Sequence, residues 1–493
     1  MFGKKKLNRA NILVAIFIFL FIATNLPAQE TRNLSYREFV SQVLKKDLNI
    51  QSYTLNEKIA RFNIARYKSL FDPVLTSLLS KDFQKEFTGS KLQSNSSDFV
   101  INKSVDFNLS ISKKFLTGAN ITLSFKNNRF KTNSDWALLN PMHTSSLTLN
   151  ISQPLLKNFG ITINRSEILK AENSLHKTEL DIKDYINKEI LKASIAYFEL
   201  VYSYKYFQAK KEALQLAKNT LKINIKKVEL GLLPKNIINE SEAEVEAREE
   251  DFIKAQQAIL NNEDKVKIFL NSIISEYTIK PVDFFFTEKV NIKLKDAVKY
   301  ALENRYELKK LEVDIKNAKL DVLKNRNGLK PELNLNVYGA VSGKGDSFND
   351  DMNRLKTNRY HNWGVGLQFS YPIFNRAAKA DFQNSVVYSK QLEIYKKQLE
   401  NSIIAEVKSS LRNLTTLRKR IKANLKALES AYEKMKTEEA KYNNKLSNVF
   451  TLFSYQTDYV NQKIKLIRAE TDYSEEVLKF YKIIGKDIYK INF

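Results

Sequence analysis

The sequence contains no cysteine, and glycine, proline and histidine are scarce. There are 12 glycines, 8 prolines and 3 histidines in 493 residues, whereas average usage is about 7% glycine and 5% proline. Without cysteine the chain cannot form disulfides, thiolate metal sites, a cysteine nucleophile or a lipidated cysteine anchor. With so few chain-breaking residues, it must have few turns and therefore long secondary-structure elements.

The chain is strongly basic, with a formal charge of +25, 43% hydrophobic residues and 27% charged residues. This composition can bury a sizeable core and is not that of a disordered chain. Lysines alternate with acidic residues along most of the length, as at Lys183 and Asp184, and form no single basic stripe. Solvated helix faces give this pattern, so we expect no nucleic acid partner.

The first residues have the layout of a secretory signal peptide, which we assign to residues 1–28. Cationic residues between positions 4 and 9 precede an apolar run over 12–23, which is too short for the roughly 20 residues that span a bilayer. The alternative is an uncleaved anchor helix, because Leu26 is large for its place before the cleavage site. No later segment suits a membrane helix, so any membrane that the exported chain crosses must be crossed by strands.

The prolines indicate an internal duplication. A shift of 258 residues superposes Pro73 on Pro331, and a shift of 218 superposes Pro154 on Pro372. We therefore divide the chain after the signal peptide into a first structural repeat over 29–280, a second repeat over 281–485 and a C-terminal tail over 486–493. The first repeat is the longer one, because it carries extra sequence at about 81–144.

Each repeat is predicted to contain an opening helix, strands, a very long helix, a reversal and a shorter helix. The opening helices are expected at about 35–69 and 293–327, and glycine and proline are both absent from 161–230 and 373–484. Apolar residues three and four apart form a seam along each long helix, which is typical of coiled-coil packing. The first seam includes Ile190, Ala193, Tyr197, Leu200, Leu214, Leu221 and Ile225, and the second includes Ile403, Val407, Leu414, Leu428, Ala431, Met435 and Tyr442.

Several segments alternate strictly between apolar and small or polar residues. The apolar positions are Val105 to Ile111, Ile121 to Phe125, Leu147 to Ile151, Leu333 to Val337 and Trp363 to Tyr371, taking every second residue. This alternation is typical of outer membrane barrel strands, although a soluble sandwich would also show it. We expect about four to six strands, fewer than the roughly eight that close the smallest transmembrane barrel. An open sheet edge is costly in lipid, so several chains would have to share one barrel.

Two further pairs of segments accompany the duplication. The opening over 34–39 has a partner over 292–297, and Gln153 to Gly160 has a partner in Tyr371 to Asn375. Through these motifs and the duplication, the sequence resembles the TolC family of outer membrane factors. The resemblance implies an α+β membrane protein with a transmembrane β-barrel shared between protomers and a long antiparallel α-helical coiled-coil barrel. It also implies a homotrimer with a 12-stranded barrel, four strands coming from each protomer. The extra sequence near 81–144 departs from this plan, and could add barrel strands or form an elaboration.

The resemblance further implies a passive exit duct in the outer membrane, with a helical extension into the periplasm. Its partners would be outer membrane lipid, a periplasmic adaptor (membrane fusion) protein and an inner membrane efflux pump or ABC exporter. The positions that match the helix tips, where the adaptor docks, are Gly231, Leu232, Leu233, Lys445, Leu446 and Ser447. The positions that match the periplasmic entrance are Asn239, Glu242, Thr451 and Ser454. The usual acidic ring would be replaced in the second repeat by the neutral Thr451 and Ser454.

We expect no catalytic residues, metal ligands or cofactors. His143, His176 and His361 have no metal-ligand spacing, and no catalytic triad signature is present. The run over 343–345 is predicted to be a surface loop. The alternating residues Tyr489, Ile491 and Phe493 are predicted to form either a barrel-sorting tail or a strand. Phe284 to Phe286 is predicted to pack against a strand. The alternatives to an export channel are an exported coiled-coil adhesin or cell-envelope rod, and a soluble enzyme.

Overall fold

The computed structural model describes residues 31–491 apart from 89–97, 275, 284 and 287–289. The predicted signal peptide at 1–28 lies outside these residues, as do Phe284 and Phe493. The chain divides into two compact units. One contains Met1–Thr54, Ile182–Tyr306 and Glu400–Phe493, and the other contains Leu55–Asp181 and Glu307–Leu399. We refer to them as the helical unit and the sheet unit.

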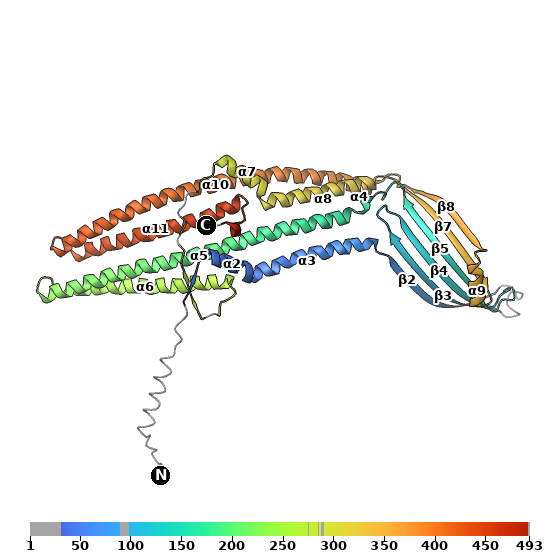
Figure 1. Ribbon diagram of the computed structural model, residues 1–493, viewed down its shortest axis with the longest axis horizontal. Coiled ribbons are helices and arrows are strands. Elements are labelled where there is room, and N and C mark those ends of the chain that lie inside the picture. The colour runs from blue at the N-terminus through green and yellow to red at the C-terminus, as the bar shows by residue number, and fades with distance from the viewer. Residues whose placement is uncertain (1–30, 89–97, 275, 284, 287–289, 492–493) are drawn as a thin grey trace, which may run out of the picture. The chain divides into compact units, whose positions relative to one another are not determined.

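Two helical hairpins dominate the helical unit (Figure 1). Helix α5 (Ser166–Glu229, 64 residues) is followed by α6 (Asn236–Phe269), and α10 (Arg376–Asn443, 68 residues) by α11 (Val449–Ile483). The predicted seams are confirmed, because Ile190, Ala193, Tyr197, Leu200, Ile403 and Val407 are at most 1% exposed. Long helices follow from the lack of glycine and proline, and the buried seam holds them against their neighbours.

A small parallel sheet and an aromatic cluster complete the helical unit. Strand β1 (Thr31–Leu34) pairs in parallel with β6 (Thr278–Pro281). The core beside it contains Tyr36, Tyr197 and Phe198, and Tyr36 stacks on Phe198 with ring centroids 5.4 Å apart. Phe285, from the run predicted to pack against a strand, is 5% exposed in this core. In the C-terminal tail Ile488–Lys490 forms a 3₁₀ helix (η3) whose Ile488 is buried, so Tyr489 does not belong to the predicted strand, and Phe493 lies outside the described residues.

Both opening helices are broken, where one continuous helix was expected. Asp47 separates α2 (Tyr36–Lys46) from α3 (Leu48–Lys68), and Arg305 separates α7 (Leu294–Asn304) from α8 (Tyr306–Gly328). Each separating residue has an extended backbone, and the two lie 258 positions apart, the same shift that superposes the prolines. At Asp47 the carboxylate accepts a hydrogen bond from the Ile50 amide at 2.9 Å, so it caps the helix that follows.

The sheet unit contains one antiparallel sheet of six strands in the order β2-β3-β4-β5-β7-β8. The strands are β2 (Val74–Phe87), β3 (Phe99–Lys114), β4 (Asn120–Thr132), β5 (Met142–Pro154), β7 (Glu332–Gly345) and β8 (His361–Ser370). The four strands per chain that the family resemblance implied are therefore too few. The extra sequence near 81–144 adds β3 and β4 to the sheet, because the turn at Gly118, with φ of 97°, folds them into a hairpin.

The five strand pairings of this sheet place all odd-numbered strand residues on one face. In the cross-strand pairs Leu79–Phe107, Phe125–Leu147 and Val337–Val365 both members are odd-numbered, and directly opposed residues share a face. The odd face carries the predicted apolar positions, and the even face carries mainly small and polar residues such as Ser110, Ser124 and Thr148. We call the first the apolar face and the second the polar face.

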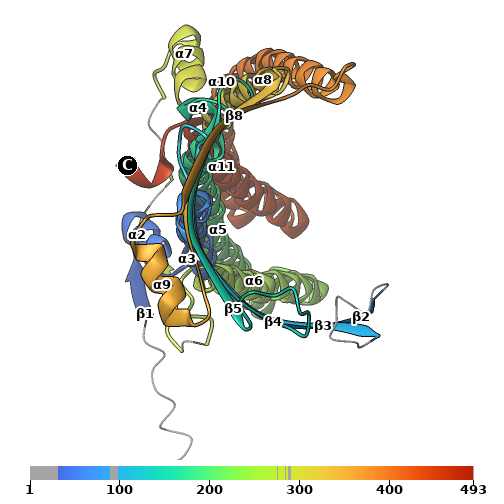
Figure 2. The ribbon, with the colours of Figure 1, turned by 90° about the vertical axis from the view of Figure 1, so that its right-hand side faces the viewer.

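A short helix, α9 (Phe348–Lys356), covers one end of the apolar face. The Asp351 carboxylate is fully buried there and accepts hydrogen bonds from the amide and the hydroxyl of Ser145. Gly343 leaves the space that α9 occupies, since a Cβ there would lie 2.1 Å from the Asp351 carbonyl oxygen. The run over 343–345 is thus the end of β7 and not the predicted surface loop. In Figure 2 the sheet is curved and α9 lies on its convex side.

Candidate functional site

The two helix reversals end in the same backbone motif. At the end of α5, the Leu232 amide donates to the Lys227 carbonyl at 2.8 Å and the Gly231 amide to the Val228 carbonyl at 2.9 Å. At the end of α10, the Leu446 amide donates to the Lys441 carbonyl at 2.9 Å. These are Schellman motifs, which need a left-handed residue just after the helix. Gly231 fills that position with φ of 70° and Lys445 with φ of 62°.

Apolar side chains project from both tips. Leu232 is 46% exposed, and Leu446 is 76% exposed, whereas the corresponding residue of a Schellman motif frequently packs back on its own helix. Leu230, the first residue of the predicted tip segment, is 73% exposed. Phe450 was not selected from the sequence and is 79% exposed. Its only sequence signal is an apolar residue beside a reversal and outside the buried seam. Together these four residues form what we call the tip patch.

The remaining predicted tip and entrance residues are divided between surface and packed positions. Gly231, Lys445, Asn239, Glu242 and Ser454 are exposed, and Leu233, Ser447 and Thr451 are half-buried. The Ser447 hydroxyl donates to the Glu438 carboxylate, and the Thr451 amide donates to Asn448 Oδ1 at 2.8 Å, which caps α11. Asn239 and Glu242 lie on α6, and Thr451 and Ser454 on α11. The tip residues are therefore accessible, while Ser447 and Thr451 also hold the second reversal together.

A polar network joins the two hairpins one turn below the tips. Tyr442 on α10 donates its hydroxyl to Asn224 Oδ1 on α5 at 2.5 Å, and Asn224 Nδ2 donates to the Ser241 hydroxyl on α6 at 2.8 Å. Lys227 Nζ donates to the Tyr442 carbonyl at 3.3 Å. Burial lowers the pKa of the Lys227 ammonium, and the positive charge of Lys445 lowers it further. These hydrogen bonds hold the two hairpins together near their tips, although Lys227 on one hairpin and Lys445 on the other are both positively charged.

A buried arginine forms a second connection between the hairpins. Arg248 on α6 is 6% exposed and pairs with Glu244 on the same helix at 2.7 Å. Its guanidinium also donates to the Ala213 carbonyl on α5 at 2.9 Å and to Gln456 Oε1 on α11 at 3.1 Å. A buried cation with several directional partners fixes the position of the three helices relative to one another.

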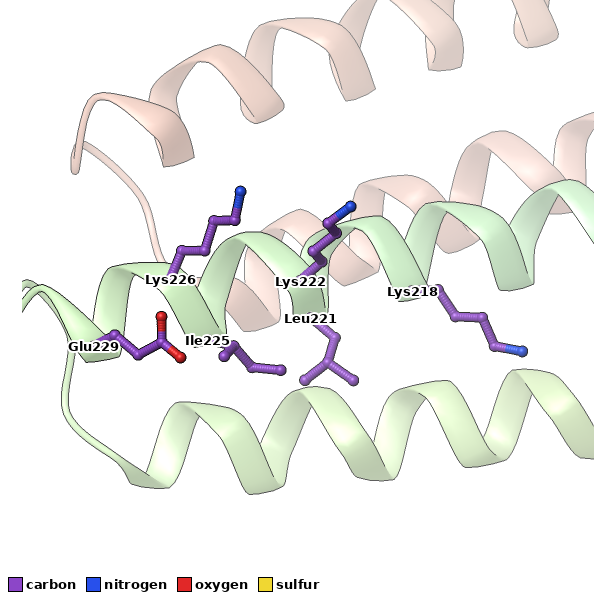
Figure 3. Close-up of a pocket in the computed structure, with 6 residues that line it drawn as sticks. All are labelled: Lys218, Leu221, Lys222, Ile225, Lys226 and Glu229. Atoms are coloured by element: carbon purple, nitrogen blue, oxygen red, sulfur yellow. The ribbon is translucent and has the colours of Figure 1, made fainter.

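A groove of about 300 Å³ runs along the last turns of α5. It is lined by Lys218, Leu221, Lys222, Ile225, Lys226 and Glu229. In Figure 3 the leucine and isoleucine point toward α6, and Lys222 and Lys226 point away from it. An apolar floor with lysines at its margin suits an amphipathic helix that bears acidic residues.

The described part of the chain contains no cluster of side chains suited to holding a metal ion. No group of three or more His, Cys, Asp or Glu residues that could hold a metal occurs in it. His143 lies within β5, His361 begins β8, and His176 is an exposed side chain on α5. None of the helices in the described ranges combines the length and apolar character needed to cross a bilayer.

Comparison with known proteins identifies a family domain in the second half of the chain. Residues 297–486 match the family described as outer membrane efflux protein. No curated protein matches the chain. The matched region contains α8, β7, β8, α10 and α11, so it includes both a long hairpin and part of the sheet.

Solved structures with the same fold cover nearly the whole chain. CusC superposes with a TM-score of 0.68 at 13% identity, over 92% of both chains. The Campylobacter jejuni CmeC outer membrane channel gives 0.67 at 15% identity, over 91% of this chain and 85% of its own. The open state of the Neisseria gonorrhoeae MtrE outer membrane channel gives 0.66 at 16% identity, over 92% and 89%. At these identities the likeness establishes the fold, which is that of TolC-like channels.

Proposed function

The chain belongs to the TolC-like outer membrane efflux proteins, and on that premise we propose that it forms a homotrimeric channel that exports small molecules or proteins from the periplasm. The channel is a passive duct that performs no catalysis. An inner membrane efflux pump or ABC exporter supplies the energy, and a periplasmic adaptor protein opens the duct. The sheet lies in the outer membrane and the helices extend into the periplasm.

One observation carries this proposal, the exposed apolar face of the sheet. Leu79, Phe107, Leu123, Leu149 and Trp363 come from five different strands of that face and are each at least 38% exposed. Such a continuous apolar surface is not stable in water, but it matches the lipid-facing side of a barrel. Strands of 10 to 16 residues are long enough for a tilted membrane crossing.

The sheet cannot close within one chain, so copies have to share a barrel. Strands β2 and β8 are its two edges, and unpaired edges are costly in lipid. Because the sheet has six antiparallel strands, β8 of one copy runs antiparallel to β2 of the next, so a barrel of two or more copies can close with every pairing antiparallel. Three copies of a six-stranded sheet make 18 strands. Since barrel diameter grows roughly linearly with strand number, this trimer would be about 1.5 times wider than the 12-stranded one.

The helices next to the two sheet edges support lateral association. Helix α3 leads into β2 and exposes Leu55, Ile59 and Phe62 by 52%, 56% and 73%. Helix α10 follows β8 and exposes Val387 by 65% and Ile394 by 52%. The same two edges that need strand partners therefore also carry apolar helix surfaces, which can pack against each other between neighbouring copies.

The tips of the helical hairpins suit a gate that a partner can shift. The Arg248 and Tyr442 bonds hold one packing of the hairpins, and the exposed tip patch offers a surface that a helical adaptor could bind. An adaptor that binds a wider packing more tightly would shift the population toward it. The rival function, an exported coiled-coil adhesin or rod, gives no role to the apolar face of the sheet.

The oligomer can be tested directly. Detergent-extracted protein should have the mass of three chains, and the same preparation should conduct ions in planar bilayers. Phe62→Asp should break the trimer, because a charge would enter the interface between α3 and its neighbour, while Asn56→Asp on the same helix should not. A soluble monomer, or a Phe62→Asp protein that keeps its mass and conductance, would refute the shared barrel, and a two-chain mass would refute the trimer.

A further inference from the structure

Five cationic side chains gather at one end of the apolar face. Lys81 and Lys85 lie on β2, Lys103 on β3, and Arg129 and Lys131 on β4. All five are odd-numbered strand residues, so the registers place them on the same face. They occupy neighbouring rows in the half of the strands farthest from α3, the helix that leads into β2. We call them the basic band.

Charge is separated between the two faces of these strands. On β2 the sequence alternates so that Lys81, Phe83 and Lys85 lie on the apolar face, while Asp82 and Glu86 lie on the polar face. The five band residues are exposed, and none of them forms an ion pair with a residue that the structure describes. The general excess of lysine in this chain does not explain a band that excludes acidic residues from its face.

Two cations of the band directly oppose each other. Lys103 and Lys131 are cross-strand partners on β3 and β4, and like charges at such positions destabilise a sheet. Arg129 is the next residue of β4 on the same face. A sheet that keeps this unfavourable arrangement can offset its cost by binding an anion between the cations.

The position of the band restricts what the anion can be. Leu79 and Phe107 form the adjacent row of the same face, so a ligand of the band also meets an apolar surface. Phe83 and Phe99 lie among the cations, and Lys85 Nζ is 4.2 Å from the Phe99 ring centroid. Cations and aromatic rings at the end of an apolar belt are the arrangement found at a membrane interface. The ligand is therefore an amphiphile with an anionic head.

We propose that the basic band binds the phosphate groups of lipid headgroups in the outer leaflet of the membrane. This inference rests on the proposed function, which puts the apolar face in lipid and the far strand ends at the outer surface. The acidic residues of the nearby helix α9 do not compete for the band. Asp351 is buried and accepts hydrogen bonds from Ser145, and Asp350 pairs with Arg354 at 3.0 Å.

Lipid retention in nanodiscs tests the proposal. The discs contain phosphatidylcholine with either bisphosphorylated lipid A or enzymatically dephosphorylated lipid A, and native mass spectrometry counts the lipid A that stays bound. The test protein carries Lys103→Gln, Arg129→Gln and Lys131→Gln, which remove three cations of the band. The matched control carries Lys114→Gln, Lys126→Gln and Lys344→Gln, which change cations on the polar face of the same sheet.

The wild-type protein and the control should retain the phosphorylated lipid, and less of it as salt is raised. The band variant should retain at least about tenfold less, since each cation near an anionic lipid contributes roughly a factor of five. Equal retention by the variant, or equal retention of dephosphorylated lipid A, would overturn the proposal. Conductance of the same proteins in planar bilayers separates the two ideas. A conducting protein without phosphate preference refutes only the lipid site, and a protein that never inserts refutes both.

A single substitution distinguishes lipid binding from a structural role. Lys131→Glu converts the opposed pair with Lys103 into an attractive one, so the sheet should be at least as stable to heating in neutral detergent. The same change places a negative charge in the band and should lower lipid A retention several-fold. A variant that is stable and still retains the wild-type amount of phosphorylated lipid would contradict the proposal.

Discussion

Gly231 and Lys445 occupy the same position in the two helical hairpins, each being the left-handed residue that ends a long helix. Their φ angles are 70° and 62°, and each is followed by an exposed leucine. Only glycine adopts this backbone conformation without a steric cost. One of the two tips is therefore strained where the other is not.

Replacing Lys445 by glycine should stabilise the protein. Lys445→Gly removes a steric cost of about 1 kcal/mol, and it also removes the charge that lowers the pKa of the Lys227 ammonium. Thermal unfolding in detergent, combined with hydrogen exchange at the tips, measures the effect. Lys441→Gly, four residues earlier within α10, should instead destabilise by about 1 kcal/mol. A Lys445→Gly protein that unfolds more easily would contradict the assigned strain.

Truncating the tip patch should impair adaptor coupling without affecting stability. Leu232→Ala combined with Leu446→Ala removes side chains that are 46% and 76% exposed, so the free energy of unfolding should change by less than about 0.5 kcal/mol. Crosslinking to the adaptor and export by intact cells provide the readouts. Leu425→Ala, at a residue that is 45% exposed on α10 away from the tips, is the control. Unchanged export in the double variant would count against adaptor docking at this surface.

Removing the buried arginine should loosen the hairpins. Arg248→Met leaves the Ala213 carbonyl and Gln456 without their donor, which should cost about 2–4 kcal/mol. Because the lost bonds connect α6 to α5 and α11, we also expect a higher resting conductance in planar bilayers. Glu244→Gln changes only the half-buried partner on the same helix and should cost at most about 1 kcal/mol. Equal effects of the two changes would mean that the contacts between helices do not matter.

A buried carboxyl on α11 should make stability depend on pH. Burial raises the pKa of Glu475 above its ordinary 4.5, against the opposing charge of Lys479, and its Oε1 has no hydrogen-bond partner among the described residues. Because the folded chain holds this proton more tightly than the unfolded chain does, stability falls as pH rises from 4.5 through the raised pKa.

Glu475→Gln should abolish that loss and stabilise the protein at neutral pH by at most about 1 kcal/mol, because the change also removes the ion pair with Lys479. Thermal unfolding between about pH 4 and pH 8 measures it, since the effect should vanish at the acidic end of the range. Glu433→Gln, at an exposed position of α10, should leave the pH profile unchanged. If the Glu475→Gln protein were less stable than the wild type at neutral pH, the assigned direction of the pKa shift would be wrong.

Sequence reasoning reached the long helices and their buried seams because both depend on local signals. The lack of glycine and proline fixes helix length, and a repeat of three and four residues fixes which side chains are buried. It missed the breaks at Asp47 and Arg305, since neither is a helix-breaking residue. It likewise missed Phe450, because an exposed apolar residue beside a reversal differs from a buried one only in its surroundings.

The strand count shows the same limit. The alternation of apolar and polar residues identified most strands. It is weak in β2, because Lys81 and Lys85 lie on the same face as Leu75 and Leu79. Only the pairing of β2 with β3 over its whole length makes it a strand of the sheet. The family resemblance supplied four strands per chain, and the hairpin of β3 and β4 raised the number to six.

The sequence by itself determined which residues are apolar, where helices must be long, and that each strand has two unlike faces, because these properties depend on neighbours along the chain. Only the tertiary structure decided that six strands pair in one sheet, that Lys103 lies opposite Lys131, and that Arg248 joins three helices. Such contacts join residues far apart in the chain, and local preference carries no information about which distant partner is met.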